Sequence, residues 1–134
     1  MVTAVDTNVF LDVFLDDPQF RKRSFEALLN AFRSGEVIVG EVVWAETGAA
    51  FDNKDLFEKT MSELGVRFLP MPKQAATSAA DMWRLAKSRK TLPPRRVVAD
   101  FLVGAHAYSC ADCLLTRDKG FYREYFNALK VIEP

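Results

Sequence analysis

The sequence predicts an α/β fold in which helices cover both faces of a mostly parallel sheet. Short runs of apolar and β-branched residues recur along the 134 residues, and stretches with helical spacing separate them. Strands that alternate with helices in this way pair in parallel. Because 49% of the residues are apolar and no linker or repeat divides the chain, residues 1–134 are expected to form a single domain with a substantial core.

The strands of this sheet are predicted from their composition. Each candidate is a short segment of mainly apolar or β-branched residues, and turn or helix signals follow it. The predicted strands are residues 2–5, 37–39, 66–69, 113–116 and 129–132.

The helices are predicted from apolar side chains at three- and four-residue spacing. In residues 19–34 these side chains share one face, and Asp17-Pro18 before them supplies a start. Residues 97–110 are apolar on nearly all sides, which indicates a buried helix. The aromatic residues of 120–126 (GFYREYF) are expected to pack a helix on the sheet, although they could also stack on bases. The remaining predicted helices are residues 42–51, 54–64 and 73–88.

Charge and composition argue against several classes of protein. Eighteen basic and eighteen acidic residues cancel, so no overall charge indicates nucleic acid or a membrane surface. The uncharged runs are too short to span a bilayer, and the first residues do not have the pattern of a signal peptide. Two cysteines form no disulfide framework, which favours a reducing cytoplasm.

Four acidic residues stand in surroundings that do not suit an exposed charge. Asp6, Glu46 and Asp100 are each the only charge in an apolar segment, and Asp118 follows a predicted strand. Any one of them could be a surface, cap or turn residue, and Asp100 lies near a helix start. For Asp6 the alternatives are an exposed strand end or a partner outside this chain, because an unpaired buried charge is unfavourable.

Topology brings these four acids to one place. Asp6 and Asp118 follow predicted strands, while Glu46 and Asp100 lie near helix starts, so a parallel sheet gathers them at its carboxyl edge. Carboxylates in one crevice repel one another unless a cation is present. Oxygen ligands without His or Cys favour Mg²⁺ or Mn²⁺, which can activate water for attack on a phosphodiester.

The order of these acids, in VDTNVFLD, VVWAE, VADFLVGAHA and LLTRD, resembles that of a PIN domain. The closest likeness is to the VapC-type ribonuclease toxins of toxin–antitoxin pairs, and it covers essentially the whole chain. This resemblance implies a PIN-like three-layer sandwich and a Mg²⁺- or Mn²⁺-dependent endoribonuclease that cleaves RNA. It also implies a homodimer that a cognate VapB-like antitoxin holds inactive.

The resemblance assigns roles to particular residues. Asn8 and Thr116 match polar positions beside the acids, and Asp6, Asp100 and Asp118 would hold the metal. The catalytic acids would be Asp6, Glu46, Asp100 and Asp118.

The basic segment 84–96 (RLAKSRKTLPPRR) leads directly into Asp100. It contains six basic residues and no acid, and it could be simply a solvated helix end and loop. A cationic loop beside an acidic metal site would instead attract the RNA backbone. The predicted RNA contacts are Arg89, Lys90, Arg95 and Arg96.

Other readings of the sequence have weaker support. His106, Cys110 and Cys113 lack the fourth ligand of a structural zinc site, so they are expected to be buried structural residues. A receiver-type phosphoacceptor domain would need a second acid beside Asp6 and an acceptor aspartate at the end of a middle strand. A PIN-like chain that binds RNA or protein without cutting remains a third possibility.

Overall fold

The computed structural model describes residues 1–89 and 97–134, and these residues form one sheet of five parallel strands. In space the strands follow the order β3-β2-β1-β4-β5, so the first strand of the chain lies at the centre. The predicted parallel α/β fold is therefore confirmed. The strands are β1 (Val2–Val5), β2 (Glu36–Val39), β3 (Arg67–Phe68), β4 (Cys113–Leu115) and β5 (Val131–Ile132).

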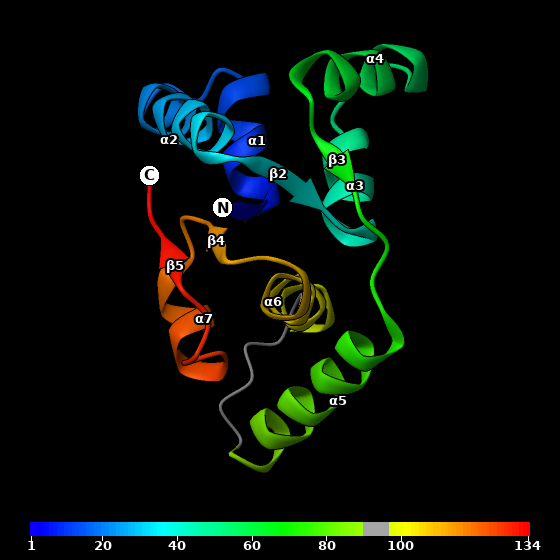
Figure 1. Ribbon diagram of the computed structural model, residues 1–134, viewed down its shortest axis with the longest axis vertical. Coiled ribbons are helices and arrows are strands. Elements are labelled where there is room, and N and C mark those ends of the chain that lie inside the picture. The colour runs from blue at the N-terminus through cyan, green and yellow to red at the C-terminus, as the bar shows by residue number, and fades with distance from the viewer. Residues whose placement is uncertain (90–96) are drawn as a thin grey trace.

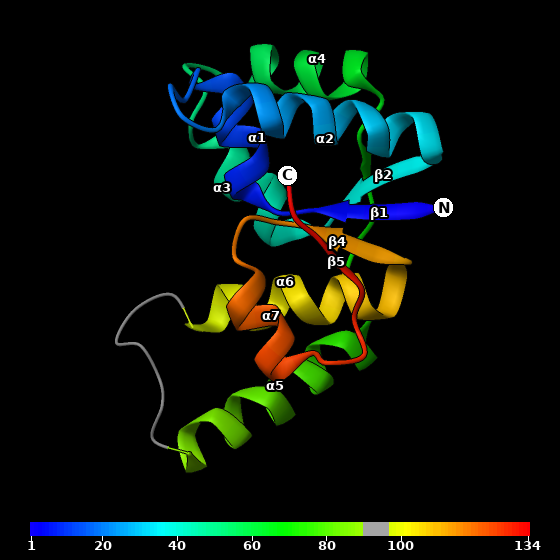
Figure 2. The same ribbon diagram turned by 90° about the vertical axis from the view of Figure 1, so that its left-hand side faces the viewer.

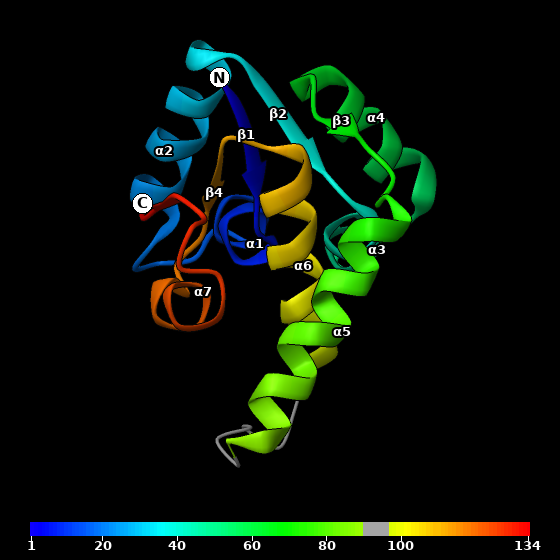
Figure 3. The same ribbon diagram turned by 60° about the horizontal axis from the view of Figure 1, so that its bottom comes forward.

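Helices cover the sheet on both sides and make it the middle of three layers. Helices α1, α2 and α4 lie on one side, and α5, α6 and α7 lie on the other (Figures 1 and 2). Helix α5 packs along α6 as an outer element (Figure 3). Within the described residues, no helix combines the length and the apolar character needed to cross a membrane. The helices are α1 (Thr7–Phe14), α2 (Arg21–Ser34), α3 (Glu41–Gly48), α4 (Lys54–Leu64), α5 (Lys73–Ser88), α6 (Val97–Cys110) and α7 (Lys119–Tyr125).

Most predicted elements agree with the structure, and the differences lie mainly at their ends. Helices α4, α5 and α6 have the predicted bounds, whereas strands β3 and β5 are only two residues long. Helix α4 shows why a local prediction succeeds: the Asn53 side chain accepts a hydrogen bond from Leu56 N at 2.8 Å, and Gly65 ends the helix with φ 82°.

Helix α1 is absent from the elements that the sequence predicted. Its residues are mostly apolar and partly β-branched, so they favour a strand by composition. The side chain of Asp6, directly after β1, accepts a hydrogen bond from Thr7 N at 2.8 Å and caps the helix. The chain therefore turns from strand to helix within one residue.

The core lies on both faces of the sheet, which explains why the strands are apolar rather than alternating. Val5, Ile38 and Leu114 from the three central strands are at most 1% exposed. Phe10 of α1 and Phe101 of α6 are equally buried. Each such side chain contributes about 1.5–3 kcal/mol to folding, so the central strands are held firmly between the helical layers.

The parallel arrangement fixes where a functional site can lie. All the strands end at the same edge, and α1, α3, α6 and α7 begin there (Figure 2). Side chains at the ends of strands and in the first turns of these helices therefore share one region of space.

A glycine at a close contact offers a test of this packing. Gly104 in α6 faces the Phe126 ring, and a Cβ there would contact the ring too closely. Gly104→Ala should lower the free energy of unfolding by ~1–3 kcal/mol in urea denaturation. Gly120→Ala in α7 is the matched control, because open space surrounds this residue and alanine favours a helix. Equal stability of the two variants would contradict the described packing.

Candidate active site

A cleft of about 470 Å³ opens at the carboxyl edge of the sheet. The four acids that the sequence singled out all line it, and they come from four separate parts of the fold. Three small or apolar residues, Thr7, Leu11 and Ala49, complete much of its wall. The acidic and amide side chains in the lining are Asp6, Asn8, Glu46, Asp100 and Asp118.

Asp6 is the most buried of these acids, with 7% of the residue exposed. One carboxylate oxygen accepts from Thr7 N at 2.8 Å. The other accepts from Thr116 Oγ1 at 2.7 Å, from Tyr122 Oη at 3.2 Å and from Asn8 Nδ2 at 3.4 Å. The donors to Asp6 in the described part of the chain are neutral, and the residue is buried rather than at an exposed strand end. The second alternative, a partner outside this chain, stays a prediction.

Burial raises the pKa of two groups in this site, Asp6 and Tyr122. It raises the pKa of Asp6 above its usual range, the hydrogen bonds from Thr116, Thr7 and Tyr122 oppose that rise, and the charge of Glu46 adds to it. The pKa of Tyr122 is raised strongly, first by burial and then by the charges of nearby carboxylates. Tyr122 therefore stays neutral and donates its proton in a hydrogen bond to Asp6.

The other three acids differ in burial and in local role. Glu46 lies in the second turn of α3, is half-buried and accepts from Thr7 Oγ1 at 2.8 Å. Asp100 lies in the first turn of α6 and is half-buried; α6 starts at Val97, so Asp100 is not its cap. Asp118 is exposed just before α7, and its side chain makes no capping hydrogen bond.

The two predicted polar residues lie beside Asp6. Thr116 is fully buried and also accepts from Asp118 N at 3.0 Å. Asn8 contacts Thr116 Oγ1 at 3.4 Å and accepts from Arg117 N at 3.2 Å. Asn8 and Thr116 therefore connect the buried acid to the segment that carries Asp118.

The chemistry of this cleft fits a hard divalent cation. Its titratable lining groups in the described residues are all carboxylates, without His or Cys. Within residues 1–89 and 97–134, no three His, Cys, Asp or Glu side chains lie close enough together to hold an ion as they stand. The cleft thus has suitable oxygen ligands, and closing on an ion would require the carboxylates to move toward one another.

Two groups in this region were missed as site residues from the sequence. Tyr122 was expected to pack on the sheet or to stack on bases, yet its hydroxyl donates to Asp6. The sequence offered one general signal for this contact, because the hydroxyl of a buried tyrosine usually forms a hydrogen bond. The second group is the ion pair between Asp12 and Arg117 beside the cleft, with Nε and Oδ2 2.8 Å apart.

The remaining predictions concern residues outside the cleft. His106 and Cys113 are buried as expected, whereas Cys110 is only half-buried. The His106 ring contacts the Leu69 carbonyl at 2.8 Å. Arg89 is exposed at the end of α5. The other predicted RNA contacts, Lys90, Arg95 and Arg96, lie outside the described residues.

Comparison with solved structures shows the same fold over nearly the whole length. VapBC-1 from nontypeable Haemophilus influenzae matches with a TM-score of 0.72 at 15% identity, over 99% of this chain and 98% of that chain. VapBC2 from Rickettsia felis, bound to a promoter DNA fragment, matches with 0.70 at 14% identity over 99% and 98%. FitAcB from Neisseria gonorrhoeae matches with 0.70 at 22% identity over 98% and 96%.

Comparison of the sequence itself identifies the family. A search of curated protein sequences gives no match. The model of the PIN domain family, in contrast, matches residues 3–127, which is nearly the whole chain. The described fold, with its parallel sheet and an acidic cleft at the carboxyl edge, agrees with that match. The chain therefore belongs to the PIN domain family.

Proposed function

We propose that this protein is a metal-dependent endoribonuclease that hydrolyses RNA phosphodiesters. The observation that carries the proposal is the convergence of Asp6, Glu46, Asp100 and Asp118 on one cleft. These acids are far apart in the sequence, and folding brings their carboxylates close together although like charges repel one another. Such an arrangement is understandable if a cation and a phosphodiester are to be bound there.

The basic residues on either side of Asp118 support this proposal because they pair with other acids. Arg117 binds Asp12, and Lys119 Nζ lies 3.2 Å from Glu133. Among the described residues that line the cleft, none is basic. The cleft therefore has the negative charge that a divalent cation requires.

In this proposal Asp6, Asp100 and Asp118 hold Mg²⁺ or Mn²⁺, and Glu46 orients the attacking water. When bound, the ion would polarise the scissile phosphate and lower the pKa of that water. The hydrogen bond from Thr7 to Glu46 restricts the movement of that carboxylate. Hydrogen bonds of this kind around ligands tune both affinity and orientation.

The hydrogen bonds to Asp6 have a comparable role. Thr116 and Tyr122 donate to the same oxygen, while Thr7 N donates to the other. The carboxylate is thereby held in one orientation before any substrate arrives. Such preorganisation favours catalysis because little reorganisation is left for the reaction itself.

RNA and an antitoxin are the partners that the resemblance to VapC-type toxins supports. The similar solved structures are described as VapBC and FitAB assemblies, and one is a toxin–antitoxin complex from Klebsiella pneumoniae. By analogy this chain is the toxin, acts in the cytoplasm as a homodimer and is held inactive by a VapB-like antitoxin. A short gene for a DNA-binding antitoxin should therefore lie directly beside its own gene.

The cleavage reaction tests the central proposal. Purified protein, freed of antitoxin, should cut structured RNA in Mn²⁺ and not in EDTA. The products should carry a 3′-hydroxyl, because water rather than the ribose 2′-hydroxyl attacks.

Asp100→Asn should lower the rate on the order of 100-fold or more, since the acids act as a unit. Asp55→Asn on the exposed surface of α4 is the matched control and should cut normally. A 2′,3′-cyclic phosphate end, or cleavage in EDTA, would contradict the mechanism.

The stability of the metal-free protein tests the state of Asp6. Because burial raises its pKa, the folded chain holds this proton more tightly than the unfolded chain does. The free energy of unfolding should therefore fall as the pH rises through the raised pKa. In urea denaturation with EDTA from about pH 4 to 8, Asp6→Asn should remove this component of the fall, and Asp55→Asn should retain it.

Added metal should oppose this loss of stability. Millimolar Mn²⁺ at neutral pH should raise the melting temperature of the wild type, because it binds the folded state alone. The increase should be much smaller for Asp6→Asn. A wild-type melting temperature that does not respond to Mn²⁺ or Mg²⁺ would count against the metal site.

A further inference from the structure

A partly buried ion pair between Asp12 and Arg117 lies between α1, α2 and the segment that joins β4 to α7. Arg117 donates from Nε and Nη2 to the two carboxylate oxygens of Asp12, at 2.8 and 2.9 Å. The Asp12 side chain is 3% exposed and that of Arg117 is 32% exposed. Two parallel hydrogen bonds between planar groups fix orientation as well as distance.

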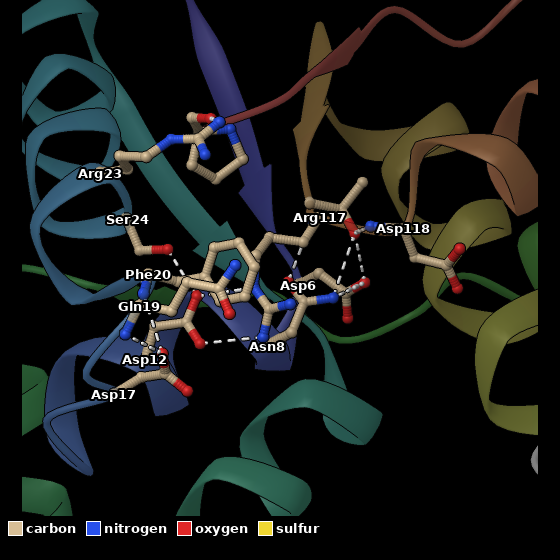
Figure 4. A network of polar contacts seen from close by, with 12 residues as sticks. Asp6, Asn8, Asp12, Asp17, Gln19, Phe20, Arg23, Ser24, Arg117 and Asp118 are labelled. Carbon is tan, nitrogen blue, oxygen red and sulfur yellow. Dashed lines mark hydrogen bonds and ion pairs between the residues drawn. The ribbon is translucent and has the colours of Figure 1, made fainter.

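Two residues from the region of α2 complete the surroundings of this pair (Figure 4). Ser24 Oγ, fully buried, donates to Asp12 Oδ2 at 2.6 Å. The Arg117 guanidinium lies over the Phe20 ring, with 4.1 Å between its Cζ and the ring centroid. Asp12 thus accepts from Ser24 as well as from Arg117, and the Phe20 ring lies beneath the guanidinium.

The ion pair holds a segment that carries site residues. Arg117 stands directly between Thr116, which donates to Asp6, and Asp118, which lines the cleft. Its backbone N also donates to Asn8 Oδ1 at 3.2 Å. The segment is therefore tied to α1 twice, once through the Arg117 backbone and once through its guanidinium.

Figure 4 shows the Arg117 and Asp118 side chains pointing in different directions from adjacent positions. The Arg117 guanidinium contacts Asp12, while Asp118 faces the cleft. Because one backbone segment carries both, a rotation that released the guanidinium would also displace Thr116 and Asp118. Fixing one side chain thus restricts the other.

We propose that Asp12 and Arg117 are positioning residues that hold Thr116 and Asp118 in place for metal binding. This inference rests on the proposed function of the cleft. Neither residue contacts the substrate or the ion in this role. They act through the backbone from Thr116 to Asp118, in the way that residues behind metal ligands set ligand orientation.

Arginine is required at position 117 by this geometry. Lysine has the same charge, but its single ammonium cannot form the paired hydrogen bonds or lie flat on Phe20. Arg117→Lys should therefore leave the charge balanced while loosening the orientation of the segment. Asp12→Asn removes one charge and keeps the shape of the side chain, so it tests the pair from the other side.

Metal affinity measured on folded protein separates positioning from mere stability. Mn²⁺ binding to the full chain by calorimetry, at a temperature where circular dichroism shows every variant folded, should weaken about 10-fold or more in Arg117→Lys and in Asp12→Asn. The double variant should lose little more than either single one, because both act through the same contact.

Two control variants show how a loss of stability alone affects Mn²⁺ binding. Ser24→Ala removes a hydrogen bond to the same Asp12 carboxylate but leaves the Arg117 pair in place. Arg67→Lys makes the same substitution in an exposed ion pair with Glu36. Both should bind Mn²⁺ as the wild type does, although Ser24→Ala should melt at a lower temperature.

Amide hydrogen exchange of the metal-free protein gives a second readout. The amides of Arg117 and Asp118 bond to Asn8 Oδ1 and Thr116 Oγ1, and both should exchange faster in Arg117→Lys than in Arg67→Lys. Unchanged exchange together with wild-type Mn²⁺ affinity in the Arg117 and Asp12 variants would overturn the inference. A wild-type chain that binds no Mn²⁺ would instead contradict the proposed function, and the exchange rates would then decide the positioning role alone.

Discussion

The buried carboxylate of Asp6 is the group on which the rest of this arrangement depends. A charge at 7% exposure is tolerable only if hydrogen bonds replace its water, and here they come from Thr7, Asn8, Thr116 and Tyr122. These donors belong to three parts of the fold: the start of α1, the end of β4 and helix α7. Satisfying one side chain therefore fixes how the central strand, its helix and the C-terminal elements meet.

The two acids near the ends of helix α1, Asp6 and Asp12, have different hydrogen-bond partners. Asp12 is balanced by the guanidinium of Arg117, whereas the donors to Asp6 are neutral and its pKa remains raised. A buried acid that serves only structure is best paired with a cation in its own chain, because removing one partner of a buried pair costs about 3–5 kcal/mol. Among the described residues no cation binds Asp6 in this way, and this difference is understandable if, as proposed, a metal ion is its partner.

The parallel sheet explains why such a site can be assembled from short, ordinary segments. Each strand ends at the same edge, so a single residue after a strand or in the first turns of a helix suffices to contribute a side chain. The rigid part of the structure lies in the fully buried strands, while the acids vary from buried Asp6 to exposed Asp118. In the proposed function, Asp6 would be a ligand held by its hydrogen bonds, and only the side chains of the more exposed acids would turn toward a bound ion.

The sequence by itself determined the elements whose signals are local. Residues 54–64, 73–88 and 97–110 are helices as predicted, because periodicity and end signals lie within each segment. The gathering of Asp6, Glu46, Asp100 and Asp118 in one cleft also followed from the predicted parallel pairing, because parallel strands end at the same edge of a sheet. Only the tertiary structure decided the partners of these acids. Thr116, Tyr122 and Arg117 reach their partners across more than 100 residues of chain, and composition favoured a strand where the Asp6 cap begins α1. Contacts of this kind depend on distance in space, which no local pattern encodes.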